Sequence, residues 1–142
     1  MKPKYLLLIV LLAIVIVALV GLKMYFKPHA DVNKLEADFT VDAITLINEF
    51  QDQEDAATNK YSEKVLKISG TLASKSQLSN GTTLLVLQDE MEGISCQLDS
   101  NWVAANQKVI DSLEPGSPVI VKGVCKGYLM EIKVSPAVVV DQ

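Results

Sequence analysis

At residues 65–72 the chain reads Val-Leu-Lys-Ile-Ser-Gly-Thr-Leu, and this stretch decides the fold. Leu66, Ile68 and Leu72 alternate with polar or smaller residues, so one side of an extended chain would be apolar. A period of two is typical of a strand with one buried face, and Gly70 inside it indicates a bend. The stretch therefore predicts a half-buried, bent strand.

Downstream, alternating apolar runs separated by turn signals predict four more strands. Ser-Asn-Gly at 79–81 is a hairpin signal. Residues 101–113 return to helical spacing, and Glu-Pro-Gly at 114–116 ends that helix. The four expected strands cover residues 82–88, 94–98, 119–125 and 129–140.

The resulting order is three strands, a helix and two strands, which is the element pattern of an OB-fold, a partly open Greek-key barrel. We therefore expect a mainly β fold, with a five-stranded OB-type barrel over residues 61–142. A half-open sandwich of the same strands is the alternative. The barrel interior should contain five apolar side chains: Leu66, Ile68, Leu72, Val119 and Val121.

Upstream of the barrel, residues 40–60 predict an amphipathic helix that packs on it. Apolar residues recur every third position over about 41–53, and Thr40 is the expected N-cap. Residues 28–39 are rich in acidic and polar side chains, and Pro28 blocks the continuation of any preceding helix. We expect this segment to be a linker.

Residues 1–27 predict a membrane anchor. Residues 5–22 contain no charged side chain, and 18 helical residues rise about 27 Å, close to the thickness of a hydrocarbon core. A cleaved signal peptide is the alternative, but its apolar region is shorter and ends in small residues. We expect an uncleaved, single-pass transmembrane helix in the inner membrane. The short N-terminal segment favours a cytoplasmic N-terminus and a periplasmic domain.

The part of the chain after the apolar segment is acidic. All 13 basic residues are lysines, and four of them flank that segment. Residues 28–142 therefore hold nine lysines against 17 acidic residues, a formal charge of −8. Because nucleic-acid affinity rests on cationic side chains that displace counterions from phosphates, we expect no nucleic acid among the partners.

The residues expected on the ligand face of the barrel support the same exclusion. OB-folds that bind nucleic acid present stacking aromatic and basic residues on their second and third strands. The strands expected at 82–88 and 94–98 contain neither. Tyr128, expected in the loop between the last two strands, is the candidate ligand contact. Four lysines could still gather into a basic patch on such a barrel: Lys67, Lys75, Lys122 and Lys126.

Cys96 and Cys125 are the only cysteines. They either form a disulfide, worth about 3.5 kcal/mol for a loop of about 30 residues, or remain two buried thiols, and the sequence leaves both open. His29 is the only histidine and lies in the expected linker. We therefore expect no metal site, no cofactor and no catalytic constellation. The acidic residues at 89–92 lack the spacing of a calcium loop and are interpreted as a solvated turn.

Five short segments share their pattern of glycine, cysteine and strand residues with a known group: Asn59–Lys64, Ile68–Gly70, Ile94–Leu98, Leu113–Gly116 and Val121–Gly127. They resemble the tRNA_anti-like family of bacterial OB-fold proteins. The resemblance spans about residues 38–140 and implies an OB barrel with a preceding helix. It implies neither tRNA binding nor any particular site residue.

Together these observations predict a non-catalytic, membrane-tethered OB-fold binding module at the cell envelope, which takes a protein partner or a small ligand. The alternative from another class is a nucleic-acid-binding OB-fold protein, which rests on fold analogy alone. A hydrolase has no residue in this sequence to support it.

Overall fold

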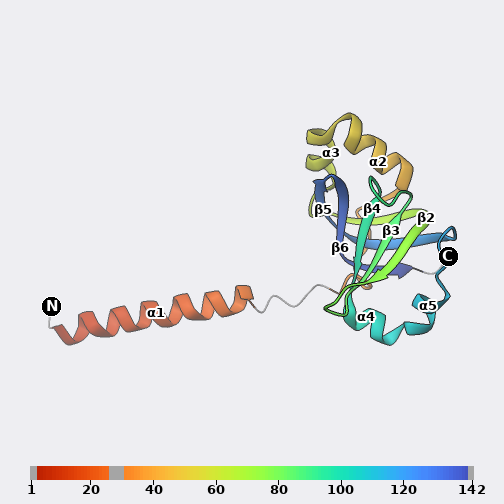
Figure 1. The fold of residues 1–142 in the computed structure, drawn as a ribbon. Coiled ribbons are helices and arrows are strands. Elements are labelled where there is room, and N and C mark those ends of the chain that lie inside the picture. Colours follow the sequence, from red (N-terminus) through yellow and green to blue (C-terminus); the bar gives the residue numbers. More distant parts are fainter. Residues whose placement is uncertain (1–2, 26–30, 141–142) are drawn as a thin grey trace. The chain divides into compact units, whose positions relative to one another are not determined.

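The computed structural model describes residues 3–25 and 31–140. The chain divides into two compact units, Met1–Ala30 and Asp31–Gln142. The first contains α1 (Pro3–Tyr25), a helix of 23 residues. The second contains all the remaining elements (Figure 1). His29, which we expect in the linker, lies outside the described residues.

The helix predicted over residues 5–22 is present as α1. The large apolar side chains described along it are between 45% and 71% exposed. In the part of the chain that the structure describes, no helix has both the length and the apolar character needed to cross a membrane. The predicted transmembrane role of α1 is therefore not confirmed, and it stays a prediction.

Over residues 31–140, the second unit forms six strands and four short helices. Along the chain these are β1 (Phe39–Asp42), α2 (Ala43–Asp52), α3 (Glu54–Tyr61), β2 (Val65–Gln77), β3 (Thr83–Leu87), β4 (Ile94–Leu98), α4 (Ser100–Ala105), α5 (Gln107–Ser112), β5 (Pro118–Leu129) and β6 (Glu131–Val140).

Five of these strands close into a barrel, which confirms the OB-type fold. The strands are ordered β1-β2-β3-β4-β6-β5, and a further pairing of β2 with β5 closes the barrel. The long strand β2 pairs with two other strands of the barrel: residues 65–71 pair with β5, and residues from 72 onward pair with β3. Its register shifts between Leu72 and Ser74, where the strand bends from one neighbour to the other. Closure of the barrel excludes the half-open sandwich.

The region before β2 differs from the sequence-based expectation. Thr40 is not an N-cap, because residues 39–42 pair in parallel with β2 as the strand β1. The N-cap is Asp42, whose carboxylate accepts the N–H of Ile44 at 2.9 Å. A short strand thus takes the place of the expected first helical turn, and the helix begins at Ala43.

The end of the expected linker belongs to the barrel unit. Lys122 on β5 donates from Nζ to the carbonyl oxygens of Asn33 and Leu35, both at 2.9 Å. Val32 is only 3% exposed. Asp38 accepts a hydrogen bond from the first residue of β2. Residues 31–38 are therefore held against the outer surface of the barrel.

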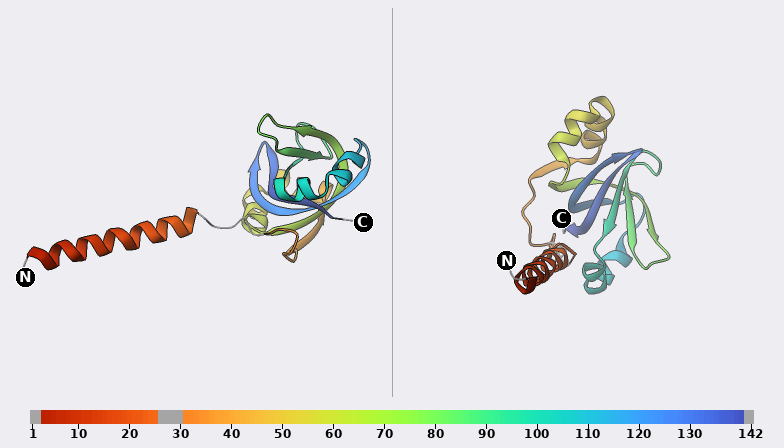
Figure 2. Two further views of the ribbon diagram at one scale, coloured as in Figure 1. Left: turned by 90° about the horizontal axis from the view of Figure 1, so that it is seen from below. Right: turned by 90° about the vertical axis from the view of Figure 1, so that its left-hand side faces the viewer.

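The helix predicted over residues 101–113 is divided into α4 and α5. Asp99 caps α4 by accepting the N–H of Trp102 at 2.9 Å. The chain then breaks at Asn106, whose side-chain Nδ2 donates to the carbonyl of Trp102 at 2.8 Å. The carbonyl of Trp102 also accepts the backbone N–H of Asn106 at 3.0 Å, and α4 ends there because the φ of −125° at Asn106 departs from helical geometry. The two helices lie across one end of the barrel (Figure 2).

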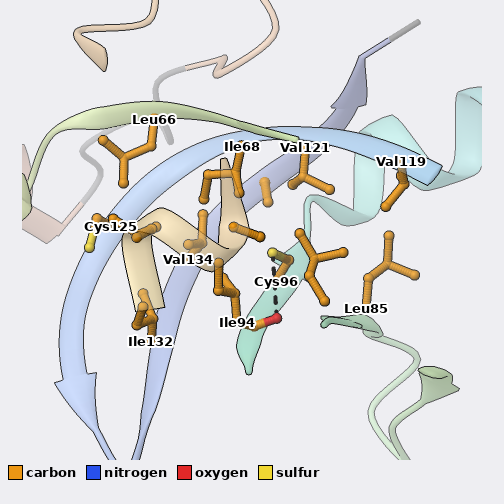
Figure 3. Packing of buried hydrophobic residues seen from close by; sticks show 14 of the residues in the cluster. Leu66, Ile68, Leu85, Ile94, Cys96, Val119, Val121, Cys125, Ile132 and Val134 are labelled. Carbon is orange, nitrogen blue, oxygen red and sulfur yellow. Dashed lines mark hydrogen bonds between the residues drawn. The ribbon is translucent and has the colours of Figure 1, made fainter. Parts of the chain in front are cut away.

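The barrel interior is filled by apolar side chains from the strands that form it (Figure 3). The five interior residues predicted from the sequence are each at most 3% exposed, which confirms that their side chains are buried in the barrel. Helix α2 closes the end opposite α4 and α5 by inserting Ala43, Leu46 and Phe50, each at most 1% exposed. Both open ends of the barrel are thus covered by helices (Figure 1).

Candidate binding surfaces of the barrel

One end of the barrel gathers several loops, and we call it the hairpin end. It comprises the β3–β4 loop, the β5–β6 turn and the corner between α2 and α3 (Figure 1). The two loops are neighbours, since the N–H of Ile132 donates to the carbonyl of Gly93 at 3.2 Å. Gln51 at the end of α2 donates to Glu92 of the β3–β4 loop at 3.4 Å.

The hairpin end exposes three large apolar side chains. Met91 is 84% exposed, Leu129 is 77% exposed and Met130 is 84% exposed. We call these three residues the apolar rim. Met130 also has a positive φ of 66°, a conformation that non-glycine residues seldom adopt. A tight turn of this kind normally carries asparagine or glycine, so two large apolar residues are an unusual choice here.

A cleft of about 290 Å³ lies beside the rim, between α3 and the β5–β6 hairpin. Its helical wall carries Glu54 and Asp55, and its strand wall carries Lys126 and Lys133. Leu129 of the rim also lines it. The volume is near the lower limit for small-molecule sites and can take one side chain or one small group.

Tyr128 lines this cleft but does not lie in a loop. It belongs to β5 and pairs with Ile132 of β6, because the connecting turn is tighter than the sequence suggested. Its ring stacks on Phe50, with centroids 5.8 Å apart and planes inclined by 24°. Tyr128 is therefore half-buried and held by the core, and only part of its surface is available to a ligand.

Carboxylates lie on the same segments as the apolar rim. Asp89 accepts the backbone N–H groups of Met91 at 2.8 Å and Glu92 at 3.1 Å, and these hydrogen bonds lower the pKa of its carboxyl. Lys126 is bound to Glu63 at 2.9 Å. Six acidic residues lie on the two loops and at the start of α3: Glu54, Asp55, Asp89, Glu90, Glu92 and Glu131.

A second, small surface lies on the outward face of β3 and β4, where Leu84 and Gln97 are accessible and Val86 and Ser95 are only 8% exposed. Leu84 pairs with Gln97, and Val86 pairs with Ser95, while the alternate residues of both strands point into the core. Within the bounds that the structure gives them, these strands carry no lysine and no aromatic residue. They also carry no acidic residue, so the charge of −8 is not concentrated on this face. Lys133 of β6 pairs with Ser95 at its border.

The four candidate lysines do not form one patch. Lys67 and Lys122 are direct cross-strand partners on β2 and β5. Lys75 lies at the other end of the barrel, where Nζ donates to the carbonyls of Ile110 at 2.8 Å and Leu113 at 2.9 Å. There it satisfies carbonyls at the end of α5. The basic patch that the sequence allowed is thus reduced to one pair.

Cys96 and Cys125 are both free and buried. Each is paired in register with Val134, Cys96 from β4 on one side of β6 and Cys125 from β5 on the other. They are therefore two strand spacings apart, about 10 Å, which exceeds the Cα separation of about 7 Å that a disulfide tolerates. The disulfide alternative is wrong in this fold, and both thiols pack in the core (Figure 3).

Both thiols should be inert in the folded protein. Burial raises the pKa of Cys96 to about 12 from 9.0, which lowers its thiolate population about a thousandfold. Burial also raises the pKa of Cys125. We expect iodoacetamide at pH 8 to label neither residue in the native chain and both in urea, as measured by intact mass. A native mass lower by two hydrogens, without labelling in urea, would instead reveal a disulfide.

A larger groove of about 460 Å³ lies between α2 and α3, and no sequence pattern indicated it. Glu49 and Lys60 form an ion pair across it at 2.9 Å. The hydrogen bond from Lys60 lowers the pKa of Glu49. Lys60 also lies 4.5 Å from the ring centroid of Tyr61. These contacts join the two helices, and we interpret them as structural.

Potential metal-ligating side chains are dispersed over the described residues. Among them, no three His, Cys, Asp or Glu side chains converge in a way that could hold a metal ion. The apolar rim is not evident from the sequence, because Leu-Met-Glu at 129–131 continues the apolar pattern of the expected last strand. The nearby turn signal, Gly127, precedes Leu129 and Met130 and therefore does not indicate that these residues form the turn.

Comparison with known proteins identifies the group to which this fold belongs. The sequence model of the tRNA_anti-like family matches residues 1–136. No curated protein sequence matches the chain. A solved structure of a proposed nucleic acid-binding lipoprotein from Klebsiella pneumoniae subsp. pneumoniae MGH 78578 is 16% identical, with a TM-score of 0.55 over 81% of this chain and 100% of that chain. The S. pombe Stn1–Ten1 complex is 17% identical, with a TM-score of 0.41 over 55% and 59%.

Proposed function

We propose that this chain, which belongs to the tRNA_anti-like family, is a non-catalytic OB-fold module that binds a protein partner through the apolar rim. The exposure of Met91, Leu129 and Met130 is the observation that carries this proposal. Large apolar side chains exposed together on an otherwise acidic domain are typical of a protein-binding surface. The positive φ of Met130 adds a conformational cost that a turn without a function would avoid.

We further propose that α1 tethers this module to the inner membrane, with the barrel on the periplasmic side. The apolar character of residues 5–22 and the exposure of their described side chains support a lipid environment. Replacing both Leu12 and Ile16 by arginine is expected to move the protein from the membrane pellet to the supernatant after alkaline extraction. A wild-type chain that is itself fully extracted would contradict the tether.

The protein-binding role can be tested by co-isolation from native membranes. The rim variant Leu129→Ser with Met130→Ser should lose at least nine-tenths of the partner recovered with the wild type. Leu78→Ser is the matched control, since Leu78 is a 44% exposed leucine in the β2–β3 loop, at the opposite end of β3. Equal recovery of the same protein with both variants would contradict binding at the rim.

A second candidate function is binding of single-stranded nucleic acid. The structurally similar Klebsiella lipoprotein has a proposed nucleic-acid-binding role. The outward face of β3 and β4 carries no acidic residue, which weakens the expectation against nucleic acid that we drew from net charge. Lys133 borders this face.

Fluorescence anisotropy of the full chain with a labelled oligonucleotide at about 150 mM salt separates the two candidates. The proposed protein-binding function predicts no binding at low micromolar concentration. Binding that weakens steeply with salt and falls at least fivefold in Lys133→Gln would favour the second candidate, because phosphate contacts release counterions.

A further inference from the structure

The hairpin end combines two features that constrain the chemistry of a partner. The apolar rim of Met91, Leu129 and Met130 is exposed, and six carboxylates lie on the same loops and on the start of α3. We infer that the segment received here is a basic, amphipathic stretch of the partner, with apolar side chains on one face and lysine or arginine around it. This inference rests on the proposed protein-binding function and names the class of its partner.

The hairpin end carries a net negative charge even when its lysines are counted. Lys126 is already bound to Glu63 at 2.9 Å, which leaves Lys133 as the other cation in the cleft. Two backbone N–H groups lower the pKa of Asp89, so its carboxyl stays charged to lower pH than that of an ordinary aspartate. The six carboxylates outnumber these two lysines, one of which is already paired with Glu63, so the hairpin end attracts a cationic segment and repels an acidic one.

The apolar side chains fit a helix or extended segment better than a flat surface. Two of the three are methionines, whose unbranched side chains adapt to differently shaped apolar partners. Leu129 belongs to the rim and also lines the cleft of about 290 Å³. A long basic side chain could therefore pack its methylene groups on Leu129 and direct its charge toward Glu54 and Asp55 on α3.

Other occupants fit less well. An anionic lipid surface would meet the carboxylates of Asp89, Glu90 and Glu92 on both sides of Met91. Nucleic acid would meet the same repulsion. A basic amphipathic segment suits an acidic surface that exposes methionine, since charge steers it and apolar contacts hold it.

The test uses an amphipathic peptide of lysine and leucine, about 18 residues long to give roughly five helical turns, labelled with fluorescein, and the full chain in an uncharged detergent. Fluorescence anisotropy at about 150 mM salt is expected to give low-micromolar binding above that of empty micelles. Leu129→Ser with Met130→Ser should weaken it at least tenfold, and Glu90→Lys with Glu92→Lys should do the same. Added salt should weaken binding to the wild type.

Two controls match these variants in chemistry and differ in place. Leu78→Ser removes an exposed leucine away from the hairpin end, and Asp111→Lys with Glu114→Lys reverses two charges at and just after the end of α5. Both should bind the peptide within twofold of the wild type. Because all these residues lie at the surface, unchanged thermal unfolding of each variant verifies that its fold is intact.

The outcomes separate this inference from the function on which it rests. If the rim variant loses its native partner but charge reversal leaves peptide affinity unchanged, the basic class is wrong and the protein-binding role stands. If the rim variant binds both peptide and native partner like the wild type, both are wrong. If the rim variant instead loses binding to phosphatidylglycerol vesicles that the wild type shows, the rim contacts lipid, and both proposals are overturned.

Discussion

Replacing Phe50 by alanine is expected to lower the free energy of unfolding by about 3–5 kcal/mol, the range for a fully buried phenylalanine. Phe50 is 1% exposed. Its ring centroid lies 6.1 Å from that of Tyr61 and 5.8 Å from that of Tyr128. The side chain therefore joins α2, α3 and β5, and its loss leaves a cavity bounded by two aromatic rings.

Urea unfolding of the full chain, followed by circular dichroism, measures this effect. Ile44→Ala is the control, since Ile44 lies on the same helix but is 55% exposed, and it should change stability by about 0.5 kcal/mol or less. A loss below about 1 kcal/mol for Phe50→Ala would mean that α2 does not close the barrel. The helix predicted from the sequence would then be an appendage of the fold.

Gly123→Ala is expected to destabilise the domain by about 3 kcal/mol, because the added methyl group has no space. A Cβ at this position would collide with Cγ1 of Val134 and lie 2.9 Å from both the Cβ of Ala137 and the carbonyl oxygen of Pro136. All three neighbours belong to the paired strand β6, so β5 and β6 would have to separate. The register between them shifts beside Gly123, where the two strands approach closely.

Thermal unfolding compared with Gly21→Ala tests this expectation. Gly21 lies on α1, and an added Cβ there would meet no heavy atom within 4 Å, so its substitution should leave the unfolding of the barrel unchanged. Equal midpoints for the two variants would show that β5 and β6 do not approach as described. A shift confined to Gly123→Ala supports the closed barrel.

The barrel is predictable from the sequence because its signals are local. Alternation at Leu66, Ile68 and Leu72 indicates a buried face wherever the strand lies, and the prolines, glycines and acidic turns mark the ends of the strands. The interior direction of Val119 and Val121 follows from the same periodicity. Each of these statements needs only the neighbours of a residue along the chain.

Sequence reasoning fails where a tertiary contact decides between local alternatives. The residues next to Thr40 in the sequence are typical of a helix N-cap. The pairing of β1 with β2 instead places Thr40 in a strand, and the neighbouring residues do not indicate that pairing. The distance between Cys96 and Cys125 depends on β6 lying between their strands. Tyr128 lies within β5 because the β5–β6 turn is at Met130, which has a positive φ. Methionine seldom adopts a positive φ, so the sequence does not indicate a turn at this position.

The candidate site is the least predictable part, because it is formed by loops from distant parts of the chain. Met91 and Met130 lie on loops that become neighbours only through the parallel pairing of β4 with β6. Net charge is also misleading, since it does not say which face is acidic. The hairpin end is acidic, whereas the outward face of β3 and β4 has no acidic residue.

The central claim, that the apolar rim is where a protein partner docks, is tested most directly by placing a photo-crosslinking amino acid at Met130 in cells. A second chain carries it at Leu78, which is also exposed but lies away from the hairpin end. Irradiation should give one discrete protein adduct from position 130, which disappears when Glu90 and Glu92 are both replaced by lysine, and none from position 78. The same adduct from both positions, or an adduct from position 78 alone, would contradict docking at the rim.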